Sequence, residues 1–341
     1  MMKTRLLSPT NDHLDLCAEA LQRGELVAIP TETVYGLAAN AFNEEACRDI
    51  FAVKGRPLGD PLILHLAKDY PVAEIARETD LFTRLRKVFW PGPVTFVLEK
   101  TPRIAALLTA GLSSVAIRCP AHPVAKDLLR RCSFPVAAPS ANPFGYISPT
   151  TAQHVEASLG GKIPYVLDGG SAEVGLESTI LDVRDPHKIR ILRYGSLDLT
   201  TLQEAAGDVS VELPPERAHQ DPADHSPREA PGTLWRHYSP SKPLHLFTTR
   251  KQLKEILPNS KKYSLLFHTR PSGDFLSAEA NAQVTCYWLS ENGDQEEMGR
   301  NLYACLRTLD ASPGEEIWVE TIPPGPLSKA LNDRLVRAAA K

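Results

Sequence analysis

Short polar pairs recur in this sequence at the ends of apolar segments, with a spacing that suits the binding of an anion. A residue before proline is pushed toward extended backbone, and side chains at positions i and i+2 of an extended segment point to the same side. Such pairs predict polar rims at strand ends, where open α/β sheets bind ligands. The pairs are Lys54 and Arg56 in "AVKGRPLGDP", Thr31 and Thr33 in "PTETVYG", and Ser140 and Asn142 in "PSANP", with Ser148 before a proline in "YISPTT".

Cations at the ends of elements strengthen the case for an anionic ligand. Arg118 closes the apolar strand "SVAIR", where a buried arginine needs a carboxylate or another anion, and Arg193 ends "KIRILR". Together with Lys54 and Arg56 they suit a polyanion, because guanidinium groups bind phosphate and carboxylate bidentately. The simpler interpretations are solvated helix-end cations, a turn in "PSANP" and, for His65 in "LILHLA", a core histidine. The whole set predicts a nucleotide site beside a pocket for a second small polar ligand.

The motifs of several other chemistries are absent. The sequence has no GxxxxGK[ST] or GxGxxG phosphate loop, no HExxH, no GxSxG and no cluster of metal ligands. A net charge of −3 and a pI of about 6.4 argue against a chain that mainly coats nucleic acid. The cysteines form no CxxC pair and are predicted to be reduced thiols. Without a signal peptide or an apolar run of about 20 residues, the sequence predicts a cytoplasmic protein.

The polar segments lie at the ends of elements that alternate between helix and strand. Helical spacing and capping residues predict helices around 14–24, 44–53, 79–89, 122–131 and 150–159. Apolar runs predict strands at 26–30, 62–67, 94–99, 114–118, 135–139, 165–168, 178–183 and 188–193. That many strands predict an α/β domain over residues 1–208, with one sizeable twisted sheet flanked by helices.

A polar, proline-rich segment divides the chain. Between Pro214 and Pro243 it has neither a helical nor a strand period, so residues 209–242 are predicted to be a linker. Its end, "LWRHYSP", carries an aromatic and basic cluster that a plain tether does not need. Residues 243–341 predict a smaller α/β domain, with strands near 242–247, 263–268, 284–290 and 316–321 and helices near 250–257, 295–309 and 326–340.

The order of these motifs resembles the YrdC-like family, the threonylcarbamoyl-AMP synthases. The resemblance rests on "PTETVYGLAANA", "IFAVKGRPLGDPLILHL", "FWPGPVTFVL", "VAIRCPAHP", "AAPSANPFGYISPTTAQHV", "GLESTILD" and "ILRYG", which cover residues 12–200. It implies an N-terminal YrdC-like twisted mixed sheet, and the second domain resembles the Rossmann-like domain of the two-domain form. It also implies synthesis of threonylcarbamoyl-AMP from L-threonine, bicarbonate and ATP with release of pyrophosphate, the first step of threonylcarbamoyladenosine modification of tRNAs that read codons beginning with A.

The family pattern, carried over motif by motif, assigns the site residues. Lys54 and Arg56 would be catalytic, by spreading charge on the phosphates. The residues around L-threonine would be Thr33, His65, Arg118, Ala138 and Ser178. The residues around ATP would be Arg56, Asp60, Ser114, Ser140, Asn142, Ser148, Arg193 and Tyr238, the last on a linker that acts as a lid. The resemblance implies Mg²⁺ with ATP, through protein ligands that it does not identify, and no organic cofactor.

One site residue departs from the family pattern. Asp60 stands where asparagine is common, and a carboxylate that faced the triphosphate would repel it. The hypothesis is that Asp60 faces the ribose hydroxyls or Mg²⁺ instead. Tyr194 also stands where the family commonly has proline.

Two alternatives remain open at this stage. One is an RNA-binding translation factor without adenylation activity, which would bind tRNA with a steep salt dependence. The other is a related enzyme that activates carbamoyl phosphate, although no accompanying zinc-finger cysteines are present. The resemblance itself implies a downstream tRNA threonylcarbamoyl transferase complex, weak or indirect contact with tRNA, and no contact with a membrane.

Overall fold

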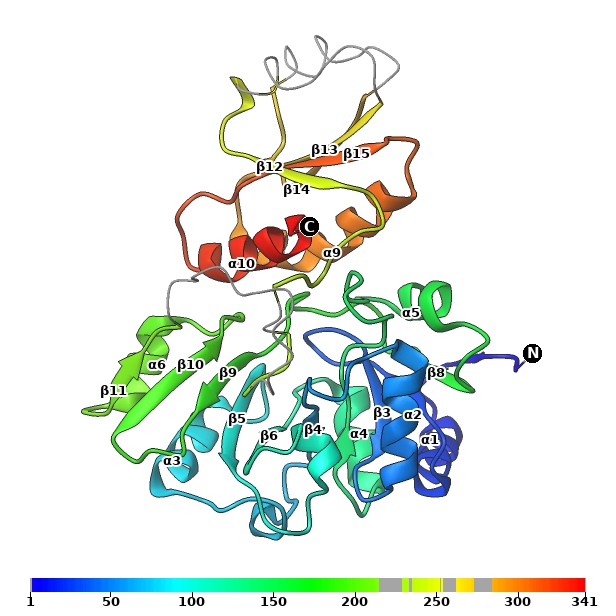
Figure 1. The fold of residues 1–341 in the computed structure, drawn as a ribbon, viewed down its shortest axis with the longest axis vertical. Coiled ribbons are helices and arrows are strands. Elements are labelled where there is room, and N and C mark those ends of the chain that lie inside the picture. The colour runs from blue at the N-terminus through cyan, green and yellow to red at the C-terminus, as the bar shows by residue number, and fades with distance from the viewer. Residues whose placement is uncertain are drawn as a thin grey trace. The chain divides into compact units, whose positions relative to one another are not determined.

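The computed structural model describes residues 2–214, 229–232, 235–251, 253, 262–272 and 284–340. They fall into two compact units, both drawn in Figure 1. Residues 215–228 and 233–234 of the predicted linker, and residues 252 and 254–257 of the helix predicted near 250–257, lie outside the described residues. Unit 1 contains Met1–Phe144, Pro149–Glu173 and Glu177–Thr233, and unit 2 contains Gly145–Ser148, Val174–Leu176 and Leu234–Lys341.

Unit 1 is built on one mixed sheet of eleven strands in the order β1-β8-β2-β3-β7-β4-β6-β5-β9-β10-β11. β4 and β6 are parallel, whereas β5 and β6 are antiparallel. The predicted mixed sheet with flanking helices is confirmed. The strands are β1 (Arg5–Leu7), β2 (Val27–Ile29), β3 (Gly36–Asn40), β4 (Ile63–His65), β5 (Val94–Glu99), β6 (Ser114–Arg118), β7 (Val136–Ala137), β8 (Tyr165–Leu167), β9 (Thr179–Asp182), β10 (Lys188–Arg193) and β11 (Ser210–Glu212).

The helices of unit 1 begin and end at typical capping residues. The side chains of Thr10, Asn43 and Thr79 each accept a hydrogen bond from a backbone N–H in the first turn of the following helix. Gly24 and Gly55 end α1 and α2 with φ of 92° and 64°, a conformation that glycine adopts without strain. The helices are α1 (Asn11–Arg23), α2 (Glu44–Lys54), α3 (Asp80–Phe89), α4 (Pro123–Arg131), α5 (Ala152–Leu159) and α6 (Leu199–Ala206), with 3₁₀ turns at Val72–Glu74 and Ala106–Thr109.

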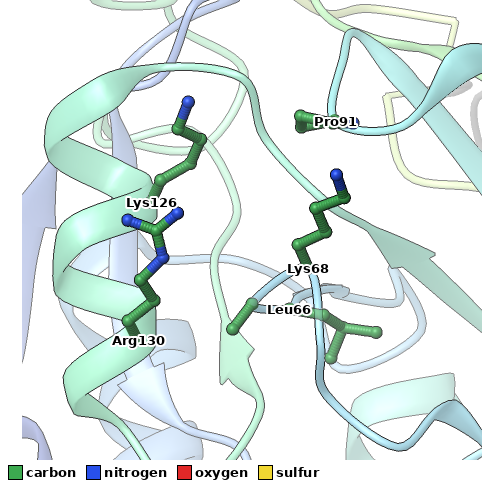
Figure 2. A pocket seen from close by; sticks show the side chains of 6 residues that line it. Leu66, Lys68, Pro91, Lys126 and Arg130 are labelled. Carbon is green, nitrogen blue, oxygen red and sulfur yellow. The ribbon is translucent and has the colours of Figure 1, made fainter.

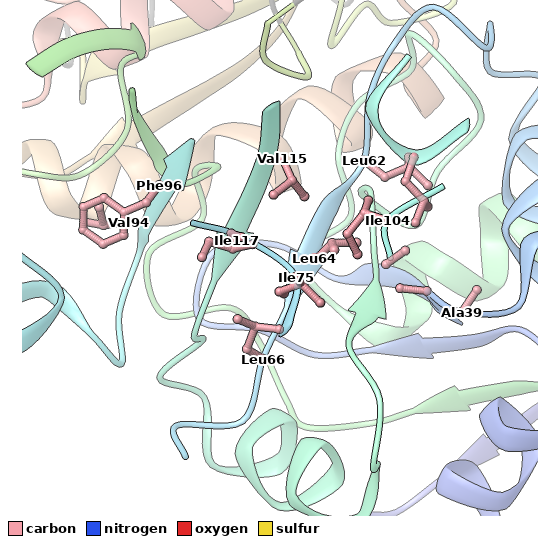
Figure 3. Close-up of a cluster of buried hydrophobic side chains, with 14 of the residues drawn as sticks. Ala39, Leu62, Leu64, Leu66, Ile75, Val94, Phe96, Ile104, Val115 and Ile117 are labelled. Atoms are coloured by element: carbon pink, nitrogen blue, oxygen red, sulfur yellow. The ribbon is translucent and has the colours of Figure 1, made fainter. Parts of the chain in front are cut away.

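Alternation along the strands separates two faces of this sheet. On one face Leu64, Phe96 and Ile117 point into the main core (Figure 3), and buried residues of α2 and α3 belong to the same core. On the opposite face α1 and α4 pack against β2, β3 and β7. Residues two apart on a strand share a face. His65 therefore lies on the same face as Ile63, and Arg118 on the same face as Ala116, which is the face opposite the main core. The polar side chains at these strand ends therefore lie opposite the main core.

Four elements of unit 1 are not anticipated from the sequence: β1, β3, α6 and β11. The segment "GLAAN" of β3 has little intrinsic preference for a strand, but Leu37, Ala38 and Ala39 are fully buried between β2 and β7. Burial on both faces outweighs such preferences in the middle of a sheet. β11 falls within the predicted linker and pairs with β10, so the sheet continues as far as Glu212.

Unit 2 holds a parallel sheet of four strands in the order β12-β15-β13-β14, which confirms the predicted smaller α/β fold. Met298, Leu302 and Leu306 are buried along one side of α9, as their spacing predicts. Within the described ranges, no helix has the length and apolar character needed to cross a membrane. The elements are β12 (Leu244–Phe247), β13 (Tyr263–Thr269), β14 (Val284–Ser290), β15 (Glu316–Glu320), α9 (Gln295–Ala311) and α10 (Ser328–Ala339).

Candidate functional site

Arg118, at the end of β6, is held by protein groups on each of its nitrogens. Its Nε donates to the carbonyl oxygen of Gly92 at 3.2 Å, and its Nη1 donates to the hydroxyl of Thr33 at 2.8 Å. Its Nη2 lies 2.7 Å from Oε1 of Glu32, and these two charged side chains are only 4% and 5% exposed. The carboxylate that the sequence required for a buried Arg118 is therefore Glu32. We call Glu32, Thr33, His65 and Arg118 the Arg118 cluster.

Sequence spacing alone misses Glu32, because it predicts extended backbone for "PTETVYG". The structure has a turn there instead. The hydroxyl of Thr31 donates to the carbonyl oxygen of Val34 at 2.6 Å and accepts from the backbone N–H groups of Thr33 and Val34 at 3.3 Å. The extended arrangement expected for Thr31 and Thr33 is thus wrong, and the turn lets Glu32 and Thr33 both reach Arg118. The sequence feature that could have identified Glu32 is an acidic residue between two threonines.

His65, the last residue of β4, lies beside Arg118 in the parallel register of β4 and β6. It is 4% exposed, and burial together with the charge of Arg118 lowers its pKa to about 3. The imidazole is therefore neutral at neutral pH. Its Nδ1 has no hydrogen-bond partner among the residues that the structure describes. Such a nitrogen suits a hydrogen bond to a polar ligand.

The buried neutral His65 is expected to make stability fall with pH below 6.5. Its pKa is about 3 in the folded chain and about 6.5 when exposed, so between these values the unfolded chain binds an extra proton. Each pH unit below 6.5 should then remove about 1.4 kcal/mol from the free energy of unfolding. Urea unfolding between about pH 7.5 and 5 should show a steeper loss for wild type than for His65→Gln. Burial also lowers the pKa of His122, but this residue is present in both proteins and contributes equally to both curves. Parallel curves would therefore contradict the prediction.

Ser178 and Arg193 form a second polar group next to the Arg118 cluster. Arg193, at the end of β10, donates to the carbonyl oxygen and the hydroxyl of Ser178 at 3.1 Å each, and to the carbonyl oxygen of Pro231 at 2.9 Å. The hydroxyls of Ser178 and Thr95 are 2.7 Å apart, and Thr95 pairs with Arg118 across β5 and β6. The structure thus brings a predicted threonine contact and a predicted ATP contact to the same strand ends.

Lys54, the last residue of α2, holds the segment that carries Ser140 and Asn142. Its Nζ donates to the carbonyl oxygens of Ser140 and Asn142 at 2.6 and 2.5 Å. It precedes the left-handed Gly55, so the expected extended pair with Arg56 is in fact a helix end. Burial and the charge of Arg56 lower the pKa of the ammonium well below its usual range. Lys54 therefore acts here on backbone oxygens, a positioning contact.

Arg56 and Asp60 form a buried ion pair in the loop after α2. Nη2 of Arg56 lies 2.9 Å from Oδ2 of Asp60, and the side chains are 3% and 2% exposed. Arg56 also donates to the carbonyl oxygens of Asp60 and Pro61 at 3.0 and 2.7 Å. The carboxylate of Asp60 thus has Arg56 as a partner, and its contact with the ribose hydroxyls or Mg²⁺ stays a prediction. Glu32 and Asp60 each offset one cation of the predicted polyanion site.

Two further predicted site residues lie on the strands of the same region. Ser114 opens β6 and is buried. Ala138 follows β7, and its backbone N–H donates to the carbonyl oxygen of Ile63 at 3.0 Å. This bond ties Ala138 to the strand that ends in His65.

Ser148 and Tyr238, which the sequence assigns to ATP, belong to unit 2. There Arg307 donates to the carbonyl oxygen of Ser148 at 3.4 Å. The ring of Tyr238 stacks on that of Tyr303 with centroids 5.6 Å apart, and the guanidinium of Arg334 lies 5.5 Å from the Tyr238 ring. The other predicted site residues all belong to unit 1.

A basic cavity of about 150 Å³ borders the end of β4 in unit 1. Figure 2 shows Lys126 and Arg130 on α4 facing Lys68 on the segment after β4. Leu66 directly follows His65, and Pro91 precedes the Gly92 whose carbonyl binds Arg118. None of its lining residues was singled out from the sequence. The lining is Leu66, Ala67, Lys68, Pro91, Lys126 and Arg130.

Two family models match the chain one after the other. The Sua5/YciO/YrdC model, described as "Telomere recombination", matches residues 19–195, and the model "Threonylcarbamoyl-AMP synthase, C-terminal domain" matches residues 198–340. The threonylcarbamoyl-AMP synthase of Pyrococcus abyssi is 35% identical over 95% of this chain and 93% of its own length. That of Bacillus subtilis is 33% identical over 98% and 94%.

The similarity extends to a solved structure. Sua5 of Pyrococcus abyssi, in complex with L-threonine, matches this structure with a TM-score of 0.84 at 32% sequence identity. The match covers 99% of this chain and 97% of the other. The resemblance therefore includes both units, and not only the eleven-stranded sheet.

Proposed function

The chain belongs to the threonylcarbamoyl-AMP synthase family, and from this membership we infer that it makes threonylcarbamoyl-AMP from L-threonine, bicarbonate and ATP. This synthesis is the first step of the threonylcarbamoyladenosine modification of tRNA. The observation that carries this conclusion is the match along nearly the whole chain to relatives of that activity. The enzyme is therefore a nucleotidyltransferase that forms an adenylate and releases pyrophosphate.

We propose that the Arg118 cluster and its neighbours bind threonine. The remaining N–H groups of Arg118 suit the substrate carboxylate, and the neutral His65 suits a polar group of the substrate. The hydroxyls of Thr33 and Ser178 offer further hydrogen bonds. The backbone of Ala138, tied to β4, would complete this side of the site.

The proposed ATP side uses the residues after α2 and at the end of β10. Arg56 and Arg193 would stabilise charge on the phosphates, and Lys54 would position Ser140 and Asn142 through their carbonyls. The family resemblance implies Mg²⁺ with ATP, where it would neutralise charge on the phosphates. The family pattern adds Asp60, Ser114, Ser148 and Tyr238 as further ATP contacts.

The proposed chemistry needs positioning and no protein nucleophile. The nitrogen of threonine bonds to the carbon of bicarbonate with loss of water, which gives a carbamate. A carbamate oxygen then attacks the α-phosphorus of ATP while the bond to pyrophosphate breaks. Holding the reactants in line can lower such a barrier by about 7–11 kcal/mol. The ordered partners of Arg118, Arg56 and Lys54 are the kind of rigid support that this requires.

Pyrophosphate release tests the proposed function directly. The protein is incubated with ATP, Mg²⁺ and bicarbonate, and with each amino acid in turn. We expect release with threonine, because the carbamate of the amino acid is the attacking group. Release that does not depend on the amino acid would contradict the proposal.

A second assay addresses the downstream partners. The product is proposed to pass to a separate tRNA threonylcarbamoyl transferase complex, with only weak or indirect contact between this chain and tRNA. Tight tRNA binding with a steep salt dependence, in a protein that releases no pyrophosphate, would favour the RNA-binding alternative.

A further inference from the structure

Glu32 is a buried carboxylate to which the proposed reaction assigns no task. It is 3% exposed, it forms an ion pair with Arg118, and neither of its carboxylate oxygens has a hydrogen-bond partner among the residues that the structure describes. Burial acts to raise its pKa, but the charge of Arg118 and nearby N–H groups outweigh burial, so the pKa lies below its ordinary value. Glu32 is therefore an anion at neutral pH, in contact with the proposed carboxylate-binding arginine.

Arg118 keeps donors for a ligand while it is bound to its protein partners. A guanidinium carries one N–H on Nε and two on each terminal nitrogen. The contacts to Gly92 and Thr33 use one N–H on Nε and one on Nη1, whereas the ion pair with Glu32 involves no hydrogen bond from Nη2. At least one N–H thus remains on each terminal nitrogen, and a bidentate carboxylate takes one from each. Arg118 can therefore hold Glu32 and a substrate carboxylate together.

A free amino acid presents both charges that this pair can recognise. At neutral pH threonine carries a carboxylate and an ammonium on the same carbon, and the side chains of Arg118 and Glu32 hold opposite charges 2.7 Å apart. We propose that Glu32 binds the α-ammonium of threonine while Arg118 binds its carboxylate, an inference that rests on the proposed function. The neutral His65 beside them adds no positive charge to repel the ammonium.

This role makes Glu32 a specificity-determining residue. A ligand that has the threonine carboxylate but no ammonium leaves the buried Glu32 without this second partner. A site with a buried polar group disfavours ligands that leave this group without a hydrogen bond. The site should therefore prefer α-amino acids over carboxylic acids that carry a hydrogen in place of the amino group.

Calorimetric binding of two ligands to the full chain tests the inference. The ligands are L-threonine and its 3-hydroxybutanoate analogue, in which a hydrogen replaces the ammonium. Glu32→Gln keeps an oxygen for Arg118 but removes the negative charge. We expect it to weaken threonine about 10- to 100-fold and to leave the analogue unchanged, because a hydrogen bond to a charged group has that effect.

Thr33→Val is the matched control, because it removes a partner of Arg118 and leaves Glu32 in place. It should weaken both ligands by the same factor. Equal weakening of both ligands by Glu32→Gln would overturn the inference and leave Glu32 as a support of Arg118 only. If Glu32→Gln does not fold, Glu32→Asp replaces it, and its shorter carboxylate should weaken threonine more than the analogue. Wild-type protein that binds no threonine would overturn the proposed function, and the inference with it.

Discussion

Replacement of Arg118 by methionine is expected to abolish threonine-dependent pyrophosphate release and to lower the free energy of unfolding by about 3–5 kcal/mol. Activity is lost because the substrate carboxylate has no guanidinium to bind. Stability falls because Glu32 becomes a buried carboxylate without its counter-ion, in a side chain that is 5% exposed. Pyrophosphate release and chemical unfolding of the purified variant measure the two effects separately.

The double variant Arg118→Met with Glu32→Gln separates the chemical role from the structural one. It removes both charges, and replacing a buried ion pair with uncharged side chains is often close to neutral for stability. We expect most of the lost stability to return while activity stays absent. A double variant that recovers threonine-dependent activity would contradict the role proposed for Arg118.

Replacement of Asp60 by alanine is expected to lower the free energy of unfolding by about 3 kcal/mol or more, because Arg56 loses its carboxylate partner in a buried loop. Asp60→Asn should cost less, since an amide oxygen still accepts a hydrogen bond from Arg56. The same change leaves the charge of Arg56 without its offset, so the KM for ATP should fall. Both variants are compared with wild type by unfolding and by pyrophosphate release at saturating threonine.

Asp182 offers a matched control for this pair. It is also a buried aspartate paired with arginines, because Arg184 and Arg190 both contact its carboxylate. Asp182→Asn should change stability without changing the KM for ATP. An unchanged KM in Asp60→Asn would assign Asp60 a purely structural role in the turn after α2.

Much of the fold could be predicted from local patterns. The apolar runs that become β4, β5 and β6, and the capped helices α1, α2 and α3, lie within a few residues of where spacing and capping place them. The prediction fails at β3, where "GLAAN" has a weak strand preference and burial between two strands decides the outcome. It also fails at β11, because a short segment after a polar helix gives no period long enough to detect.

The candidate site could be predicted only in part. Arg118 and His65 stand out as polar residues in apolar strands, and both lie on the face opposite the main core. The polar pairs were expected to be extended, but Lys54 ends a helix and Thr31 starts a turn. Glu32 cannot be found from spacing for that reason, since adjacent residues such as Glu32 and Thr33 both reach Arg118 only when the backbone bends.

The sequence by itself determined the family, the order of most strands and helices along the chain, and the need of a buried Arg118 for an anion. These follow from motifs, spacing and burial, which are local properties of the chain. Only the tertiary structure decided that the anion is Glu32 and that the carboxylate of Asp60 faces Arg56. The physical reason is that a buried charge in a low-dielectric interior is stabilised by the nearest group of opposite charge. Which group is nearest depends on how the chain packs, and sequence spacing does not give that distance.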